Sequence, residues 1–169
     1  PPPAVDESET WFAQAENDAP GRLYVGVAGQ GRSMKSLLLR TYVAMLGGAY
    51  RQHDPKRGGD SPADPYLTVA GYFNSLRELG GMRRLVEDDV RSRTMRAAGK
   101  HPEGVDDADH PWQRDRTIGI EPLELTSRRN AGEIKRAQAR LAEAYEAKEG
   151  HVDVLLASNM ISVGVDIDR

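Results

Sequence analysis

The sequence predicts an α/β fold in which an open parallel sheet is flanked by helices. Four apolar segments that are typical of strands alternate along the chain with three segments whose apolar residues recur every three or four positions, as in amphipathic helices. Strands that alternate with helices favour right-handed crossovers, and therefore a parallel sheet with helices on both faces. The last apolar run, residues 152–157, is typical of a strand that is buried on both faces. We therefore expect it to lie at the centre of the sheet.

The composition of the chain is that of one domain with a hydrophobic core and several polar loops. Of its 169 residues, 38% are hydrophobic and 29% are charged, and the net charge of -3 provides no overall attraction to nucleic acid. No apolar run approaches the roughly 20 residues that span a membrane, and there is no cysteine for a disulfide or a thiolate metal site. We therefore expect a cytoplasmic protein without a membrane partner, in which any contact with nucleic acid comes from a local patch.

The amino-terminal part combines a polar linker with the first strand and helix. Residues 1–21 are acidic and rich in proline, so we interpret them as a linker from an upstream domain and residues 22–169 as the domain itself. Residues 23–28 are expected to form the first strand. A glycine-rich turn leads from this strand into a helix that extends to about Leu46.

The turn from Gly29 to Ser36 is similar to the phosphate-binding loop G-x-x-x-x-G-K-[ST]. Met34 occupies the position of the second glycine, where a side chain would crowd the backbone amides that face a phosphate. The sequence therefore favours a simple glycine turn that begins a helix and exposes Arg32 and Lys35. An alternative interpretation is that this helix N-terminus contacts a phosphate of a nucleic acid.

A polar loop, a strand and a long helix follow. Residues 51–65 mix charged residues with glycine and proline, and we expect a solvated, mobile loop there. Residues 66–73 form the second predicted strand, and a helix is expected from about Leu76 to Met95. Asn74 and Ser75 close the strand; they could contact a ligand or simply cap the helix, and the residues do not decide between these roles.

The third predicted strand, residues 117–125, follows a polar insertion near residues 99–116 that has no metal-ligand spacing. Pro122 suits an edge or bulged strand better than a central one. Thr126, Ser127 and Arg128 come next, and the hydroxyl groups of Thr126 and Ser127 could serve a ligand or a helix cap. Asn130 and Glu133 have the pattern of a capping box at the start of the last helix.

The central predicted strand also ends in polar residues. Ser158 and Asn159 follow its apolar run, and Gly164 and Asp166 come a few positions later. In open α/β sheets ligands bind at the carboxyl ends of the strands. We therefore expect the functional site at this edge of the sheet.

The residues around this strand end resemble motif V of superfamily 2 helicases, in which an apolar strand is followed by Ala-Thr-Asp and then by Gly-Ile-Asp-Ile. The matching residues are Ala157-Ser158-Asn159 and Gly164-Val165-Asp166-Ile167, with Ser in place of Thr and Asn in place of Asp. Together with residues 72–80, this stretch looks like the large helicase of the bacterial DISARM phage-defence system and its relatives.

The resemblance implies a RecA-like fold of the P-loop NTPase type. The chain would be the second RecA-like domain of an ATP-dependent helicase or translocase, incomplete at its C-terminus. Gly164 and Asp166 would face ATP, whereas ATP and Mg²⁺ would be bound mainly by the preceding RecA-like domain, so this chain would be inactive by itself. The nucleic acid, expected to be DNA, would contact polar residues at three strand ends: Asn74, Ser75, Thr126, Ser127, Arg128, Ser158 and Asn159. The other implied partners are the upstream RecA-like domain and further defence-system proteins.

Two alternatives belong to other functional classes. The chain could be a non-catalytic interaction domain with a RecA-like fold. It could also be a small nucleotide-binding protein that uses the loop from Gly29 to Ser36 together with Asp166, but that reading lacks both the second glycine and an acidic pair for Mg²⁺.

Overall fold

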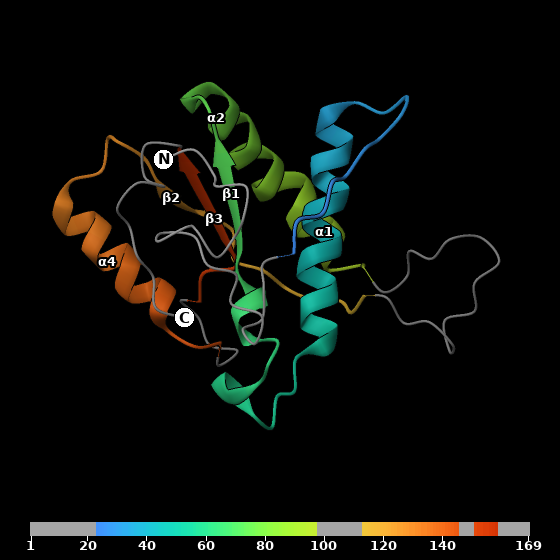
Figure 1. The fold of residues 1–169 in the computed structure, drawn as a ribbon, viewed down its shortest axis with the longest axis vertical. Coiled ribbons are helices and arrows are strands. Elements are labelled where there is room, and N and C mark those ends of the chain that lie inside the picture. The colour runs from blue at the N-terminus through green and yellow to red at the C-terminus, as the bar shows by residue number, and fades with distance from the viewer. Residues whose placement is uncertain (1–22, 98–112, 146–150, 159–169) are drawn as a thin grey trace, which may run out of the picture.

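The computed structural model describes residues 23–97, 113–145 and 151–158, and these residues form an α/β unit around a parallel sheet (Figure 1). The strands are β1 (Val69–Phe73), β2 (Leu123–Leu125) and β3 (Val154–Ser158). Within the described residues the strand order is β1-β3-β2, and both pairings are parallel. The predicted parallel α/β fold is therefore confirmed.

The central strand β3 has a different core on each of its faces. Val154 and Leu156 pack into a cluster with helices α1 (Met34–Gln52) and α2 (Leu76–Leu85), whereas Leu155 and Ala157 pack beneath helix α4 (Ala131–Ala142). This alternation follows from the two-residue period of a strand. All five residues of β3 are buried, as the apolar run predicts, and Figure 1 shows the helices on the two sides of the sheet.

Local capping chemistry sets the starts of the three main helices. The side chains of Ser33, Ser75 and Asn130 each accept a hydrogen bond from a backbone N–H in the first turn of α1, α2 and α4, respectively. A carboxylate oxygen of Glu133 accepts a hydrogen bond from the backbone N–H of Asn130, so the predicted capping box is present. The helix predicted from Leu76 to Met95 is continuous from α2 through a π-helical turn, η4 (Val86–Val90), into α3 (Arg91–Thr94).

Two predicted strands are shorter than expected because local backbone geometry ends them. Residues 64–67 form a 3-10 helix, η3 (Asp64–Leu67), with Pro65 in its first turn, so β1 begins only at Val69. Pro122 has no N–H to offer a sheet, and β2 begins directly after it, at Leu123. β2 lies at an edge of the sheet within the described residues, as Pro122 predicts.

The first predicted strand, residues 23–28, is wrong. This segment is extended but pairs with no strand of the described residues, and Leu23, Tyr24 and Val25 are 87%, 84% and 71% exposed. Its β-branched and aromatic composition fits a strand, but a strand forms only where a neighbouring edge supplies hydrogen-bond partners. The turn after it begins α1 without a strand before it.

The prediction of a solvated loop over residues 51–65 is wrong in part. The α1 helix continues to Gln52, and a short 3-10 turn, η2 (Gly58–Asp60), precedes η3. Ser61 and Asp64 are each only 3% exposed. A carboxylate oxygen of Asp64 accepts a hydrogen bond from the backbone N–H of Tyr145 at 2.7 Å, which ties this segment to the residues that follow α4.

A buried ion pair organises the amino-terminal side of the sheet. The Arg116 guanidinium donates to a carboxylate oxygen of Asp153 at 2.5 Å and to the carbonyl of Leu67 at 2.9 Å. It also lies over the rings of Tyr50 and Tyr145, at 5.6 and 5.3 Å from their centroids. Arg116 was predicted within a polar insertion, yet it is 2% exposed and joins segments that are far apart in the sequence.

Candidate functional site

The carboxyl ends of the three strands meet at one edge of the sheet, because all three strands are parallel. The register pairs Phe73 with Ser158 and Leu125 with Ala157. The polar residues that follow β1 and β2 therefore flank the end of β3. The structure thus brings together six of the predicted site residues at this edge: Asn74, Ser75, Thr126, Ser127, Arg128 and Ser158.

At the end of β1, Asn74 and Ser75 are both exposed. The Ser75 hydroxyl oxygen accepts a hydrogen bond from the backbone N–H of Glu78 at 3.2 Å, so Ser75 caps α2. A serine hydroxyl still has a proton to donate when its oxygen accepts a hydrogen bond. Capping is therefore an observed role of Ser75, and it leaves one donor that can face a ligand.

At the end of β2, a tight turn presents Ser127 and Arg128 to solvent. The carbonyl of Thr126 accepts a hydrogen bond from the N–H of Arg129 at 3.0 Å, and Thr126 itself is 5% exposed. Arg129 pairs with Glu133 at 3.2 Å. Within the described residues Arg128 has no such ion pair, so its charge is available to an anion in solution.

At the end of β3, Ser158 is 8% exposed, and its hydroxyl has no hydrogen-bond partner among the described residues. A buried hydroxyl without a partner is unfavourable by about 1–3 kcal/mol. This makes Ser158 a candidate for a ligand-binding donor. Asn159, Gly164 and Asp166 lie outside the described residues, so their predicted roles stay predictions.

The loop from Gly29 to Ser36 does not have the surroundings of a phosphate-binding loop. Such loops connect a strand of the sheet to a helix, but the residues before Gly29 pair with no described strand. Ser33 serves as the α1 cap, and Gly31 has the positive φ of 68° that a glycine turn needs. The ammonium group of Lys35 lies 3.5 Å from a carboxylate oxygen of Asp89. The geometry is that of a glycine turn into a helix.

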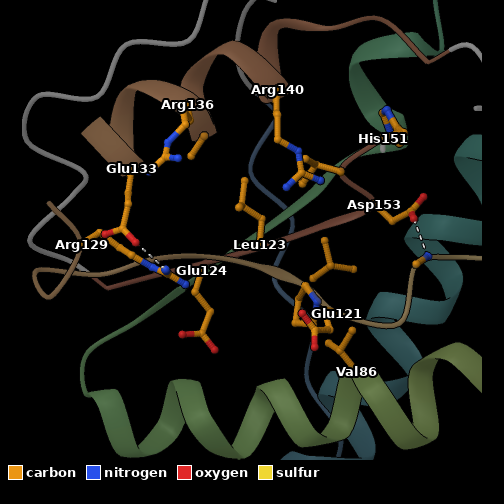
Figure 2. A pocket seen from close by; sticks show the side chains of 15 residues that line it. Val86, Glu121, Leu123, Glu124, Arg129, Glu133, Arg136, Arg140, His151 and Asp153 are labelled. Carbon is orange, nitrogen blue, oxygen red and sulfur yellow. Dashed lines mark hydrogen bonds and ion pairs between the residues drawn. The ribbon is translucent and has the colours of Figure 1, made fainter. Parts of the chain in front are cut away.

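The sequence reasoning missed a groove along β2. This groove has a volume of about 550 Å³ and is lined by α4, β2, the segment before β2, the start of β3 and Val86 of the π-helical turn (Figure 2). Glu133, Arg136 and Arg140 line it from one side of α4, and Arg129 lines it from the turn before that helix, at spacings of three and four residues. That spacing is the one sign of the groove in the sequence, because its other walls come from distant segments.

The charges of the groove are largely paired within the chain. Arg129 forms an ion pair with Glu133. The pKa of Glu133 is lowered chiefly by the hydrogen bond from the Asn130 N–H and then by the hydrogen bond from Arg129. On the opposite wall, Glu124 accepts a hydrogen bond from Arg83 at 2.9 Å. The groove therefore has charged walls without a strong excess of either sign.

Comparison with known proteins agrees with the resemblance seen in the sequence. No protein-family model matches the chain. The chain is 39% identical, over an alignment of 171 residues that includes its whole length, to a protein described as DISARM protein DrmA from Bacillus paralicheniformis.

The similarity to this DrmA protein extends over the whole length of the chain.

This similarity confirms the likeness to the DISARM protein, and it concerns a part of that protein only. The chain spans 14% of the length of DrmA from Bacillus paralicheniformis. No helix within the described residues is long and apolar enough to cross a membrane.

Proposed function

We propose that this chain is the second RecA-like domain of an ATP-dependent superfamily 2 helicase or translocase that acts on DNA in the cytoplasm during phage defence. Its similarity to a DISARM protein supports the link to phage defence. The observation that carries the proposal is the position of Ala157-Ser158 at the end of the buried central strand, where the polar ends of both neighbouring strands meet. Ligands of open α/β sheets bind at such an edge.

The proposed role of this edge is to hold one strand of DNA. Arg128 would contact a phosphate through its exposed guanidinium, and the hydroxyl groups of Ser127 and Ser158 would donate hydrogen bonds to the backbone. Asn74, Ser75, Thr126 and Asn159 complete the proposed contact surface. Few charges are involved, so binding by this chain alone would be weak and sensitive to salt.

Nucleotide binding is assigned mainly to a preceding RecA-like domain, which would supply the groups that hold ATP and Mg²⁺. Within the described residues, no strand leads through a glycine-rich loop into a helix, which is the arrangement that cradles phosphates. Hydrolysis of bound ATP would supply the free energy for movement along DNA. Gly164 and Asp166 would approach the nucleotide when the two domains close, so that closure links hydrolysis to the DNA contacts.

Binding of a fluorescent single-stranded oligonucleotide to the chain, measured by anisotropy over a range of salt concentrations, tests the DNA contact. Arg128→Glu is expected to weaken binding and to reduce its salt dependence. Arg96→Glu is the matched control, because Arg96 is an exposed arginine that follows α3, away from the strand ends. Equal losses from both variants would show diffuse attraction and would exclude this edge as the binding site.

The ATPase activity of a longer protein that contains this chain separates the proposed translocase from a non-catalytic interaction domain. We expect stimulation by DNA, and loss of that stimulation with Asp166→Ala. An ATPase that is absent, or that DNA does not affect, would favour the interaction domain. Micromolar ATP binding by this chain alone, lost with Lys35→Ala, would instead favour the loop from Gly29 to Ser36.

A further inference from the structure

A second groove follows the outer face of α2, the face that does not pack into the core. It has a volume of about 520 Å³. The inner face of the same helix is buried, with Leu79, Met82 and Leu85 in the core. We call this second groove the α2 groove; its lining includes Arg77, Gly80, Gly81, Arg83, Arg84 and Glu87.

Two consecutive glycines, Gly80 and Gly81, lie in the middle of the α2 groove, and the described part of the fold does not require them. Glycine is less favourable inside a helix than every residue except proline. Neither glycine has a positive φ, and a Cβ added at either position would meet no atom of the described residues within 4 Å. The pair therefore lowers the stability of α2 without relieving any crowding there. Glycines of this kind are typical of places where a ligand approaches the backbone closely.

Positive charge lies on both sides of the glycine pair. Arg77 precedes Gly80 by three residues and Arg84 follows Gly81 by three, so the arginines and the glycines share one face of the helix. Both arginines are exposed. The charge of the third arginine is used within the fold, because Arg83 pairs with Glu87 at 2.7 Å and with Glu124 at 2.9 Å. The groove thus presents two positive charges beside an open stretch of helix backbone.

The α2 groove begins at the edge of the sheet where the three strand ends meet. Figure 1 shows α2 beginning beside the tip of β1. Ser75 caps the helix, and Arg77 lies in its first turn. Arg84 comes seven residues later, which is about 10 Å along the helix axis. This distance corresponds to about three nucleotides of a stacked strand.

We propose that the α2 groove is a further contact surface for single-stranded DNA, which continues the strand bound at the carboxyl edge of the sheet. Arg77 and Arg84 pair with phosphates, and the glycine pair lets the sugar-phosphate backbone lie close to the helix. A polypeptide partner would need more apolar contact, and of the described residues that line the groove only Leu76 has an apolar side chain. This inference rests on the proposed function, because the groove extends the same DNA contact.

Filling the groove tests the proposal with a change that should stabilise the helix. Gly80→Leu with Gly81→Leu replaces two poor helix formers by good ones, and it is expected to raise the melting temperature by roughly 2–4 °C. The same variant should bind a fluorescent single-stranded oligonucleotide at least about tenfold more weakly, because the phosphate contacts are blocked. Ala44→Leu is the control for added apolar surface, since Ala44 is exposed on α1. Unchanged binding by the double-leucine variant would overturn the proposal.

Charge and strand length give two further measurements. Arg84→Glu should weaken binding and lower the slope of log affinity against log salt concentration by about 1. Arg93→Glu is the matched control and should bind like the wild type, because Arg93 is an exposed arginine farther along the same continuous helix. With oligonucleotides of increasing length, the affinity of the wild type should keep rising for about three nucleotides after that of the double-leucine variant has stopped.

These outcomes separate the groove from the proposed function. If Arg128→Glu weakens binding while the Arg84 and glycine variants bind like the wild type, the strand ends hold DNA and the groove does not. If no protein binds the oligonucleotide, the proposed function and the groove both fail. The groove variants should show the same losses in a longer protein that contains this chain. Losses confined to the chain alone would mean that another part of the longer protein covers the groove, and they would overturn the proposal.

Discussion

The hydroxyl oxygen of Tyr42 occupies the space where the side chain of any other residue at Gly71 would begin. Tyr42 lies on α1 and Gly71 in the middle of β1, so this contact sets how closely the helix approaches the sheet. The tyrosine is 5% exposed, and its hydroxyl has no hydrogen-bond partner among the described residues. The close contact therefore depends on the missing Cβ of a glycine rather than on a hydrogen bond.

The first prediction follows from this contact. Gly71→Ala is expected to lower the free energy of unfolding by about 1–3 kcal/mol, the usual cost of overpacking. Tyr42→Phe removes the oxygen that the methyl group would meet, so the double variant should be more stable than Gly71→Ala alone. Urea unfolding of the four proteins gives the coupling energy, expected to be at least about 1 kcal/mol. If the two substitutions instead change the free energy of unfolding additively, β1 can move away from α1 without a loss of stability.

The second prediction concerns alkaline pH. Burial raises the pKa of Tyr42 to about 12 from its ordinary value of 10.0, because the phenolate would lose hydration. The unfolded chain therefore releases this proton first as pH rises. The contribution of neutral Tyr42 to the free energy of unfolding is fully present below pH 10. It is lost as the pH rises towards 12, by about 1 kcal/mol per pH unit. Tyr42→Phe should lack this part of the loss. We would measure the free energy of unfolding of the wild type and of Tyr42→Phe between pH 9 and 12, where the difference between the two proteins should change with pH. A difference that stays constant over this range would contradict the burial of Tyr42.

The fold was largely predictable because its strongest signals are local. The apolar run of β3, the helical periodicity of α4 and the Asn130–Glu133 capping pattern are all contained in a few neighbouring residues, and all three are confirmed. Residues 23–28 carry an equally clear local pattern and are still not in the sheet. A local pattern shows that a segment can form a strand, but it does not show whether a partner edge lies nearby.

The candidate site was predictable in part for the same reason. Parallel strands bring their carboxyl ends together, so the polar residues after β1, β2 and β3 could be placed at one edge from the sequence. The groove along β2 and the burial of Arg116 depend on contacts between segments that are far apart in the chain. Arg116 stands in a polar segment, where the sequence gives no sign that Asp153 and two tyrosine rings surround its charge.

The third prediction tests the buried ion pair. Asp153→Asn keeps the shape of the side chain but leaves the Arg116 guanidinium buried without a counter-charge, which should lower the free energy of unfolding by about 3–5 kcal/mol. Arg116→Met in the same protein removes the unpaired charge and should recover part of this loss. Lys35→Ala is the control, because the exposed pair of Lys35 and Asp89 should contribute at most about 1 kcal/mol. A small effect of Asp153→Asn, similar to that of Lys35→Ala, would mean that water reaches Arg116.

The fourth prediction separates a binding role of Ser158 from a structural one. Because the buried hydroxyl has no partner among the described residues, Ser158→Ala should leave the unfolding free energy unchanged or slightly higher. If that hydroxyl donates to the DNA backbone, its loss should weaken oligonucleotide binding roughly 2- to 10-fold, the effect of one hydrogen bond. The salt dependence of binding should not change, since no charge is removed.

Ser61→Ala is the matched control for this prediction. Ser61 is also a buried serine, but its hydroxyl oxygen accepts a hydrogen bond from the backbone N–H of Asp54 at 3.2 Å, far along the chain from the strand ends. Its removal should lower stability by about 1 kcal/mol and leave binding unchanged. Ser158→Ala is therefore expected to change oligonucleotide binding and not stability, whereas Ser61→Ala is expected to change stability and not binding. If Ser158→Ala instead lowers the melting temperature and leaves oligonucleotide binding intact, its hydroxyl supports the fold, and Ser158 does not belong to the DNA site.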